Sequence, residues 1–313
     1  MFGKTLFRNN TLKLAKLLET TNCYYCNKDN ARKLYTIDGF KNDPRLFQVV
    51  ECCNCSLVYI NPRYSNDENN ERYAKEYFVD KVIDPSGRVR SFVTDRQNKV
   101  NDHKIEFNYL RRYKKTGRIL DYGAAAGYFL EALDGDWDKY ALDISGFALD
   151  SIRDRNVTKI CKTLIHAKFN DNYFDVVYAG HTLDRLIDLK KNIKELKRII
   201  KNDGIIFVTL PNIGSLCSRI FKENYRLLYA NHLIYFTPKT VKRFFNEVGL
   251  EIIDVKYPFY NTSFFSWASL LGNFIKIIIK LCFNCLRIKT KMISPPFWGN
   301  VMCVIIKNDD EKK

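Results

Sequence analysis

Histidines and acidic residues are scarce in this sequence, and both shortages limit what the protein can do. There are four histidines in 313 residues, and 35 acidic residues stand against 51 basic ones, which leaves a formal net charge of +16. So large a positive excess favours anionic partners such as nucleic acid, acidic lipid or a phosphorylated small molecule. Because richness in lysine and asparagine can also follow from genomic base composition, the charge is weak evidence for nucleic-acid binding.

The N-terminus lacks the pattern of a signal peptide. The stretch "MFGKTLFRNNTLKLAKLLE" has no uninterrupted apolar core followed by a small-residue cleavage site, and its spacing suits a short amphipathic helix. We therefore expect a cytoplasmic protein, in which ten cysteines would not form a disulfide framework. Clustered cysteines then indicate a metal site.

The chain divides into four segments by composition and pattern. With 46% apolar residues it can bury a large core. We expect a helical leader at 1–20, a four-cysteine module at 21–63, a polar linker or lid at 64–98, and a large domain at 99–313 with an apolar amphipathic insertion at 263–294.

The large domain alternates strand and helix patterns. Strands are expected at 118–123, 139–145, 174–180, 204–212, 251–257 and 298–307, and helices at 104–113, 127–133, 146–155, 191–204 and 238–249. Strands separated by helices of this length imply βαβ crossovers and a mostly parallel α/β sheet.

Four cysteines have the paired spacing of a zinc site. The pairs are Cys23-x2-Cys26 and Cys52-x2-Cys55, and 25 residues separate them. Four thiolates can converge tetrahedrally on Zn²⁺, although the interval is longer than the usual roughly 15–20 residues. The interval holds "KLYTIDG" and "LFQVVEC", two expected strands of a hairpin. Because the nearest histidine is His103, the site would be all-cysteine, closed and structural, with Cys53 a bystander. The alternative is a chance set of buried cysteines.

A glycine- and alanine-rich turn follows the first strand of the large domain. The stretch "RILDYGAAAGYFLEAL" contains Asp121-x-Gly123-x-Ala125-x-Gly127. Glycines let a backbone approach a ligand closely, but the spacing is a poor match to the dinucleotide motif. Asp121 could accept hydrogen bonds from an ammonium group. Asp143, 22 residues further on, could accept them from both hydroxyls of a ribose. The ligand predicted here has an amino acid end and a nucleoside end.

Together these stretches resemble class I S-adenosylmethionine-dependent methyltransferases. "ILDYGAAAGYFLEAL", "ALDIS", "FDVVYAGHTLDRL", "LKRIIKNDGIIFVTLPN" and "HLIYFTPKTVKRFFNEVGLEIIDV" carry the likeness across 118–257. The resemblance implies a Rossmann-like, doubly wound, mostly parallel seven-stranded sheet with a small N-terminal zinc-ribbon module. The cysteine module, which ends "CSLVYINPR", is similar to the zinc-binding part of sugar C-methyltransferases and polysaccharide-cluster methyltransferases.

The resemblance assigns cofactor roles to several residues. Gly123 and Gly127 would shape the loop, Asp121 would face the methionine part of S-adenosyl-L-methionine, and Asp143, followed by Ile144, would hold the ribose. Ala125 stands where the family usually has glycine, which is tolerable if its φ is negative.

The resemblance also suggests two outer contacts. His181 would touch the cofactor or the substrate. Tyr77 would form a lid, although plain packing is the alternative.

Catalytic roles are predicted for His232 and Tyr235. His232 in "NHLIYF" follows the fifth strand, where family members commonly carry a histidine, so it is the candidate base, with a structural histidine as the alternative. The family's Glu-His pair after the fourth strand is here Asp184-Arg185, which leaves the catalytic details open.

The segment 264–286 is about as long as a membrane span. A polar stripe recurs along it at steps of three and four, made of Asn273, Lys276, Lys280, Asn284 and Arg287. Five basic residues and no acids lie between Ser263 and Ser294. The helix could pack within the fold, form a homodimer or lie on an anionic membrane surface. A true span is disfavoured because 298–307 must rejoin the sheet.

The sequence therefore predicts a cytoplasmic, zinc-stabilised methyltransferase, with peripheral membrane contact as an open alternative. Its small acceptor would be anionic, either a nucleotide sugar or another glycan precursor. Two rival functions remain: an RNA methyltransferase that uses the zinc module and the basic surface, and a non-catalytic scaffold with a methyltransferase fold.

Overall fold

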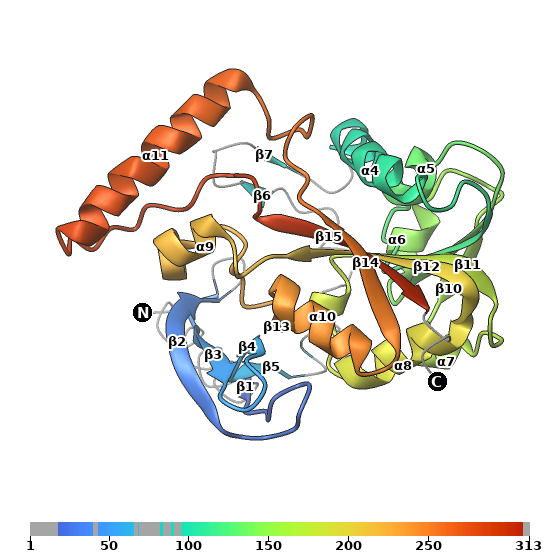
Figure 1. Ribbon diagram of the computed structural model, residues 1–313, viewed down its shortest axis with the longest axis horizontal. Coiled ribbons are helices and arrows are strands. Elements are labelled where there is room, and N and C mark those ends of the chain that lie inside the picture. The colour runs from blue at the N-terminus through green and yellow to red at the C-terminus, as the bar shows by residue number, and fades with distance from the viewer. Residues whose placement is uncertain are drawn as a thin grey trace, which may run out of the picture.

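The computed structural model describes residues 18–39, 43–65, 68, 82–83, 89–90 and 95–308 (Figure 1). Within this part of the chain, a seven-stranded sheet carries helices on both faces, and a smaller four-stranded sheet lies below it in the view of Figure 1. The large sheet confirms the predicted Rossmann-like, doubly wound α/β fold.

All strands of the large sheet run in the same direction except β15. Its order is β10 (Thr158–Cys161), β9 (Trp137–Asp143), β8 (Gly117–Tyr122), β11 (Phe174–Gly180), β12 (Ile200–Pro211), β15 (Val301–Asn308) and β14 (Leu250–Lys256). β15 runs antiparallel to both of its neighbours. The strand order reverses at β8: β9 and β10 lie on one side of it, and β11 and β12 lie on the other. Such sheets bind ligands at this switch point.

Two apolar cores fill the spaces between the sheet and its helices. One face carries α4 (Arg96–Leu110), α5 (Tyr128–Ala132) and α6 (Gly146–Asp150), and the other carries α7 (Leu164–Ala167), α8 (Leu189–Ile199) and α10 (Pro238–Asn246) (Figure 1). Neighbouring residues of one strand enter different cores, as Ile119 and Leu120 do, because side chains alternate across a strand. The near-continuous apolar runs of these strands follow from burial on both sides.

Local signals set the ends of α10 as the sequence predicts. Thr237 and Thr240 bond each other's backbone N–H groups in a capping box, and Pro238 is the first helical residue. Gly249 follows the helix with φ of 74°.

The predicted end of α8 at Gly204 is wrong. The helix ends at Ile199, and Ile200 is already extended with φ −79° and ψ 139°. Ile200 pairs with Phe174, so β12 begins four residues before Gly204. Strand pairing therefore overrides the helical pattern of this stretch.

The four-cysteine module forms the predicted hairpin and then gains a strand from far along the chain. β2 (Ala31–Asp38) and β3 (Leu46–Cys52) pair antiparallel, and β4 (Val58–Ile60) and β13 (Ile234–Tyr235) complete the sheet in the order β13-β4-β3-β2. Of the leader expected to be helical, the described part is a strand, β1 (Leu18–Glu19), because it pairs with β5 (Arg63–Tyr64). Most of the linker expected at 64–98 lies outside the described residues.

The remaining elements are short, apart from one helix. They are the paired strands β6 (Val82–Ile83) and β7 (Val89–Arg90), the 3-10 turns η1 (Leu183–Arg185) and η2 (Lys222–Asn224), α9 (Leu216–Phe221) and the long apolar helix α11 (Trp267–Cys285). In Figure 1, α11 projects from the body of the molecule beyond α9.

Candidate active site

The loop between β8 and α5 is held in left-handed backbone conformations. Gly123, Ala125 and Gly127 have φ of 80°, 47° and 70°. Ala125 therefore does not have the negative φ that was expected to make its side chain tolerable. The Ala125 N–H donates to Asp143 Oδ2 at 2.9 Å, and this bond fixes its conformation.

Gly123 and Gly127 also stand where no side chain fits. A Cβ on Gly123 would lie 2.2 Å from Thr182 Oγ1, and a Cβ on Gly127 would lie 2.9 Å from Ile152 Cγ1. The crowding comes from the protein itself, so the glycines are required by the loop's packing as well as by its φ angles.

Asp121 and Asp143 meet at the carboxyl ends of adjacent strands. Asp121 is 2% exposed, and within the described chain no hydrogen bond reaches its carboxyl group. Burial, then the charges of Asp143 and Glu106, raises the pKa of Asp121 well above its ordinary range. Burial also raises the pKa of Asp143. The backbone N–H groups of Ser145 and Ala125 donate to its carboxylate and oppose this rise. Two crowded carboxylates favour a cationic ligand.

His181 lies at the same edge, at the end of β11. Its backbone N–H donates to the Thr209 carbonyl at 2.8 Å, and its φ is 52°. Burial lowers the pKa of His181, although the charges of Asp184 and Glu106 oppose the effect. His181 thus directly follows β11, the strand that pairs with β8, which carries Asp121.

Asp184 and Arg185 of η1 form a cluster with His232 of the loop before β13, in which Asp184 and His232 are buried and Arg185 is partly exposed. Asp184 Oδ2 lies 3.4 Å from His232 Nδ1, and Arg185 Nη2 donates to His232 Nε2 at 3.2 Å. A donor at Nε2 requires a neutral imidazole with its proton on Nδ1. Within the described chain, His232 Nδ1 and both carboxylate oxygens of Asp184 are buried and make no hydrogen bond. Burial, then the Arg185 charge, lowers the pKa of His232 well below its ordinary value.

Tyr235 is occupied by the backbone. It is 1% exposed, and its hydroxyl donates to the Tyr229 carbonyl at 2.7 Å and accepts from the Tyr229 N–H at 2.8 Å. These two bonds link Tyr235 to the loop that carries His232. Tyr77, the predicted lid, lies outside the described residues.

The four paired cysteines converge. The sulfurs of Cys23, Cys26, Cys52 and Cys55 all lie within 4.8 Å of one another. Tetrahedral Zn–S bonds of about 2.3 Å place sulfurs roughly 3.8 Å apart, so the cluster fits a closed zinc site. Cys53 is exposed and stands apart from it.

Comparison with known proteins places the large domain in a family. A family model described as a methyltransferase domain matches residues 92–255, just over half of the chain. The chain belongs to this methyltransferase family. Its large domain is therefore an enzyme domain that uses S-adenosylmethionine.

Individual methyltransferases and related proteins are similar over part of their length. An uncharacterized protein of Methanocaldococcus jannaschii is 31% identical over 146 residues, which cover 41% of this chain and 63% of that protein. Demethylmenaquinone methyltransferase of Roseiflexus is 27% identical over 128 residues, which cover 38% of this chain and 50% of that enzyme.

A solved structure shows likeness in fold alone. It is a methyltransferase of Haloferax volcanii in complex with the activator Trm112, and it is 13% identical, with a TM-score of 0.51 over 69% of this chain and 92% of that one.

The residues at the methyltransferase crevice fit the cofactor. Asp121 offers a buried acceptor without a partner to an ammonium group, and the carboxylate of Asp143 can accept from two ribose hydroxyls. Ile144, next to Asp143, is 47% exposed and offers an apolar surface to a base. When bound, S-adenosylmethionine would supply an electrophilic methyl group. The described residues therefore bring Asp121, Gly123, Ala125, Gly127, Asp143, Ile144 and His181 to one edge of the sheet.

The cysteine module is joined directly to the loop that carries His232. Ile234 of β13 pairs with Tyr59 of β4, and the Ile60 N–H donates to the Leu233 carbonyl at 3.0 Å. On the other side of the cluster, Tyr25 stacks on Phe244 of α10 with ring centroids 3.6 Å apart. The module thus contacts both the loop that carries His232 and α10.

A second polar cluster below the crevice has no counterpart in the sequence analysis. Glu106 of α4 contacts His103 Nδ1 at 2.8 Å, accepts from the Tyr178 hydroxyl at 2.5 Å, and accepts from Thr209 at 3.2 Å. Burial raises the pKa of Glu106, but His103 and Tyr178 outweigh it and leave the pKa lowered. The sequence feature that could have revealed this cluster is Glu106 itself, an acid next to Phe107 on the apolar face of the predicted helix.

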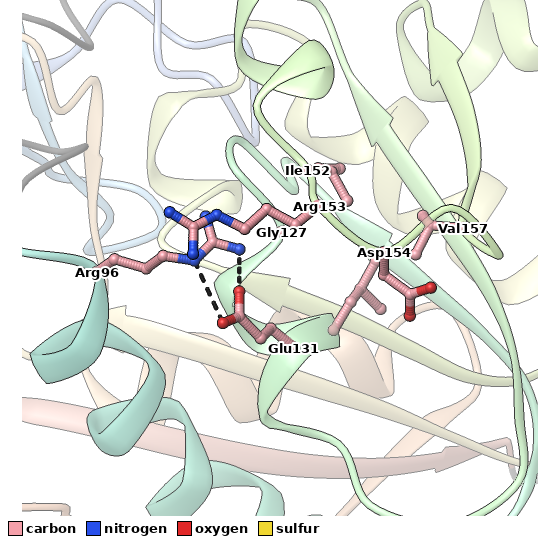
Figure 2. A pocket seen from close by; sticks show the side chains of 8 residues that line it. Arg96, Gly127, Glu131, Ile152, Arg153, Asp154 and Val157 are labelled. Carbon is pink, nitrogen blue, oxygen red and sulfur yellow. Dashed lines mark hydrogen bonds and ion pairs between the residues drawn. The ribbon is translucent and has the colours of Figure 1, made fainter.

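A separate pocket lies behind the cofactor loop. It has a volume of about 300 Å³ and is lined by residues of α4 and α5 and of 127–157. Figure 2 shows the lining side chains and the ion pair between Arg96 and Glu131. Of the cofactor loop, Gly127 alone touches it, and neither Asp121 nor Asp143 lines it. This pocket is distinct from the cofactor crevice.

Proposed function

We propose that the protein transfers a methyl group from S-adenosylmethionine to a small anionic acceptor, a nucleotide sugar or another glycan precursor. The observation that carries the proposal is the cluster of Asp184, Arg185 and His232 beside the crevice. The similarity of the cysteine module to that of sugar methyltransferases supports this acceptor class.

His232 acts as the general base in this proposal. The hydrogen bond from Arg185 to Nε2 sets the tautomer with the proton on Nδ1, 3.4 Å from Asp184, and in this tautomer Nε2 can accept a proton from an acceptor hydroxyl. Arg185 bonds Nε2 in the structure. A phosphate on the acceptor would compete for the guanidinium of Arg185, because charge-assisted bonds to phosphate are the stronger ones, and would release Nε2 for the reaction.

The same arrangement explains the replacement of the family's Glu-His pair. Asp184 supplies the carboxylate of the pair and lies beside His232, which is 48 residues away in the chain. Arg185 stands in place of the histidine of the family's pair and supplies a fixed cation. Zinc bound by the four cysteines would stiffen β4 and, through it, the loop that carries His232.

The test measures release of S-adenosylhomocysteine with a panel of nucleotide sugars. We expect His232→Ala to lower turnover about 100-fold or more while the Kd for S-adenosylmethionine changes less than about twofold. The control is His166→Ala, at an exposed position on α7, which should leave both quantities unchanged. Unchanged turnover in His232→Ala would remove this residue as the base.

The pH dependence is a second readout. Because the pKa of His232 lies well below 6.5, the imidazole stays neutral through pH 6.5, and kcat/KM should fall only at lower pH. Its unfolded form binds a proton near pH 6.5 and the folded form does not, so this residue costs stability as pH falls below about 6.5. His232→Ala should remove the contribution of this residue to the loss of stability at low pH. An acid limb centred at 6.5 or above would contradict the assignment.

The rival functions predict different results. An RNA methyltransferase should bind RNA with steep salt dependence and ignore nucleotide sugars. A non-catalytic scaffold should not bind S-adenosylmethionine in a titration.

A further inference from the structure

The apolar face of α11 points away from the protein. By length and composition α11 could cross a membrane, yet only 11% of its most apolar window is buried. Its exposed apolar side chains recur at helical spacing and are Trp267, Leu271, Phe274, Ile275, Ile278, Ile279 and Leu281. Contiguous exposed apolar surface of this kind marks an interaction site.

Three residues of the polar stripe, Asn273, Lys280 and Asn284, bond to other parts of the protein. The Asn273 amide donates to the Pro296 carbonyl at 2.8 Å, and the Lys280 ammonium donates to Thr290 Oγ1 at 2.8 Å. Asn284 donates to the carbonyl of Ile220 in α9 at 2.9 Å. Polar contacts therefore hold the helix to the rest of the protein. A helix that covers a soluble core has the opposite orientation, with its apolar face inward and its polar face toward water.

The connections of α11 exclude a span across a membrane. β14 and β15 flank it in sequence and are neighbours in one sheet, so both ends of the insertion return to the same body. Residues 286–300 contain no helix or strand and run back along α11. A spanning α11 would carry this irregular backbone through hydrocarbon, where its polar groups could not be satisfied.

The charges near α11 favour an anionic lipid surface over a second copy of the chain. Arg287, Lys289 and Lys291 are exposed just after the helix, and no acid lies between Ser263 and Ser294. In a two-fold dimer the partner would present the same segment, which contains no acid to neutralise these cations. Lipid phosphates would neutralise them instead. Trp267, 76% exposed at the start of the helix, suits the boundary between headgroups and acyl chains.

We propose that α11 docks in the plane of an anionic bilayer, with its apolar face among the acyl chains and Arg287, Lys289 and Lys291 among the headgroup phosphates. The docked segment is tied to the acceptor side of the site. Ser294 accepts from the Arg226 N–H at 3.0 Å, and its own N–H donates to the Asn224 carbonyl at 2.9 Å, in the loop that leads to His232. Docking thus brings that side of the enzyme close to the lipid surface.

The experiment is co-sedimentation of the full chain with vesicles of phosphatidylcholine, with and without phosphatidylserine. We expect binding to the vesicles that contain phosphatidylserine, and at least about tenfold weaker binding to phosphatidylcholine alone. Leu271→Glu should weaken binding at least about tenfold, because it places a charge on the inserted face. Leu46→Glu, at a similarly exposed leucine on β3, is the matched control and should bind as the wild type.

Two further measurements make the test decisive. The double change Lys289→Gln and Lys291→Gln should remove the preference for phosphatidylserine, and thermal unfolding should show that all variants are folded, since every changed side chain is exposed. The proposal is overturned if the wild type stays in the supernatant with both vesicles. A dimer that Leu271→Glu dissociates would then identify a second copy as the occupant.

Discussion

Ala125 holds a backbone conformation that alanine tolerates poorly. Its φ of 47° lies in the left-handed region, which costs an L-residue with a Cβ about 1–2 kcal/mol. The bond from its N–H to Asp143 ties this conformation to the carboxylate expected to hold the ribose. The strain therefore sits in the loop that receives the cofactor, where strain is commonly found.

Replacing Ala125 by glycine should not destabilise the protein. Glycine removes the energetic cost of the left-handed conformation. It also makes the unfolded chain more flexible, which lowers the free energy of unfolding by about 0.4–1 kcal/mol. The free energy of unfolding should therefore stay level or rise by up to about 1 kcal/mol. Ala132→Gly, inside α5 with ordinary helical geometry, should lower it by about 1 kcal/mol. Urea unfolding of both variants checks this, and equal losses would contradict the left-handed assignment.

At the scale of elements, the decisive contact is the pairing of β13 with β4. β13 directly follows the loop that carries His232, and β4 directly follows the second cysteine pair. Arg243 of α10 also donates to the Cys55 carbonyl, so a helix of the large domain contacts the cysteine cluster as well. A metal far from the methyl transfer can thus affect its geometry.

Removal of zinc should lower turnover more than cofactor affinity. Elemental analysis should find about one zinc per chain, and Cys55→Ser should lose it. Because the loop with His232 then loses its support, we expect turnover to fall about 10- to 100-fold. The Kd for S-adenosylmethionine should change much less, because the cofactor loop is built on β8 and α5.

Cys53→Ser is the matched control for the zinc experiment. Cys53 is exposed between two ligands and should leave both zinc content and turnover intact. A folded, active protein without metal would contradict the structural role of the cluster.

At the scale of the whole molecule, cofactor binding should couple to global stability. The carboxyl edge of the sheet gathers residues from β8, β9 and β11, so a ligand there joins segments that are separate in the chain. S-adenosylhomocysteine at 100 times its Kd should stabilise the fold by about 2.7 kcal/mol, or roughly 5–10 °C in Tm.

Asp143→Ala should abolish this shift. Asp138→Ala, at the exposed start of the same strand, is the control and should retain it, although Asp138 pairs with Arg118. A full shift in Asp143→Ala, measured by thermal unfolding, would place the cofactor elsewhere.

Much of the fold and of the candidate site followed from local patterns in the sequence. The strand–turn–helix stretch at Asp121 to Gly127 and the acid that ends the next strand could be placed together, because adjacent parallel strands end at one edge. The spacing of the two cysteine pairs predicted that all four sulfurs would meet at one site, as they do. These features depend on short-range geometry, which a sequence carries directly.

The tertiary structure alone decided the contacts between distant segments. Asp184 and His232 meet across 48 residues, and β13 joins β4 across about 170 residues, because strand pairing and loop packing depend on partners that no local pattern names. The periodicity of α11 shows that one face is apolar and one polar. Which face the body covers depends on where the partners of Asn273 and Lys280 lie, and only the folded chain places them.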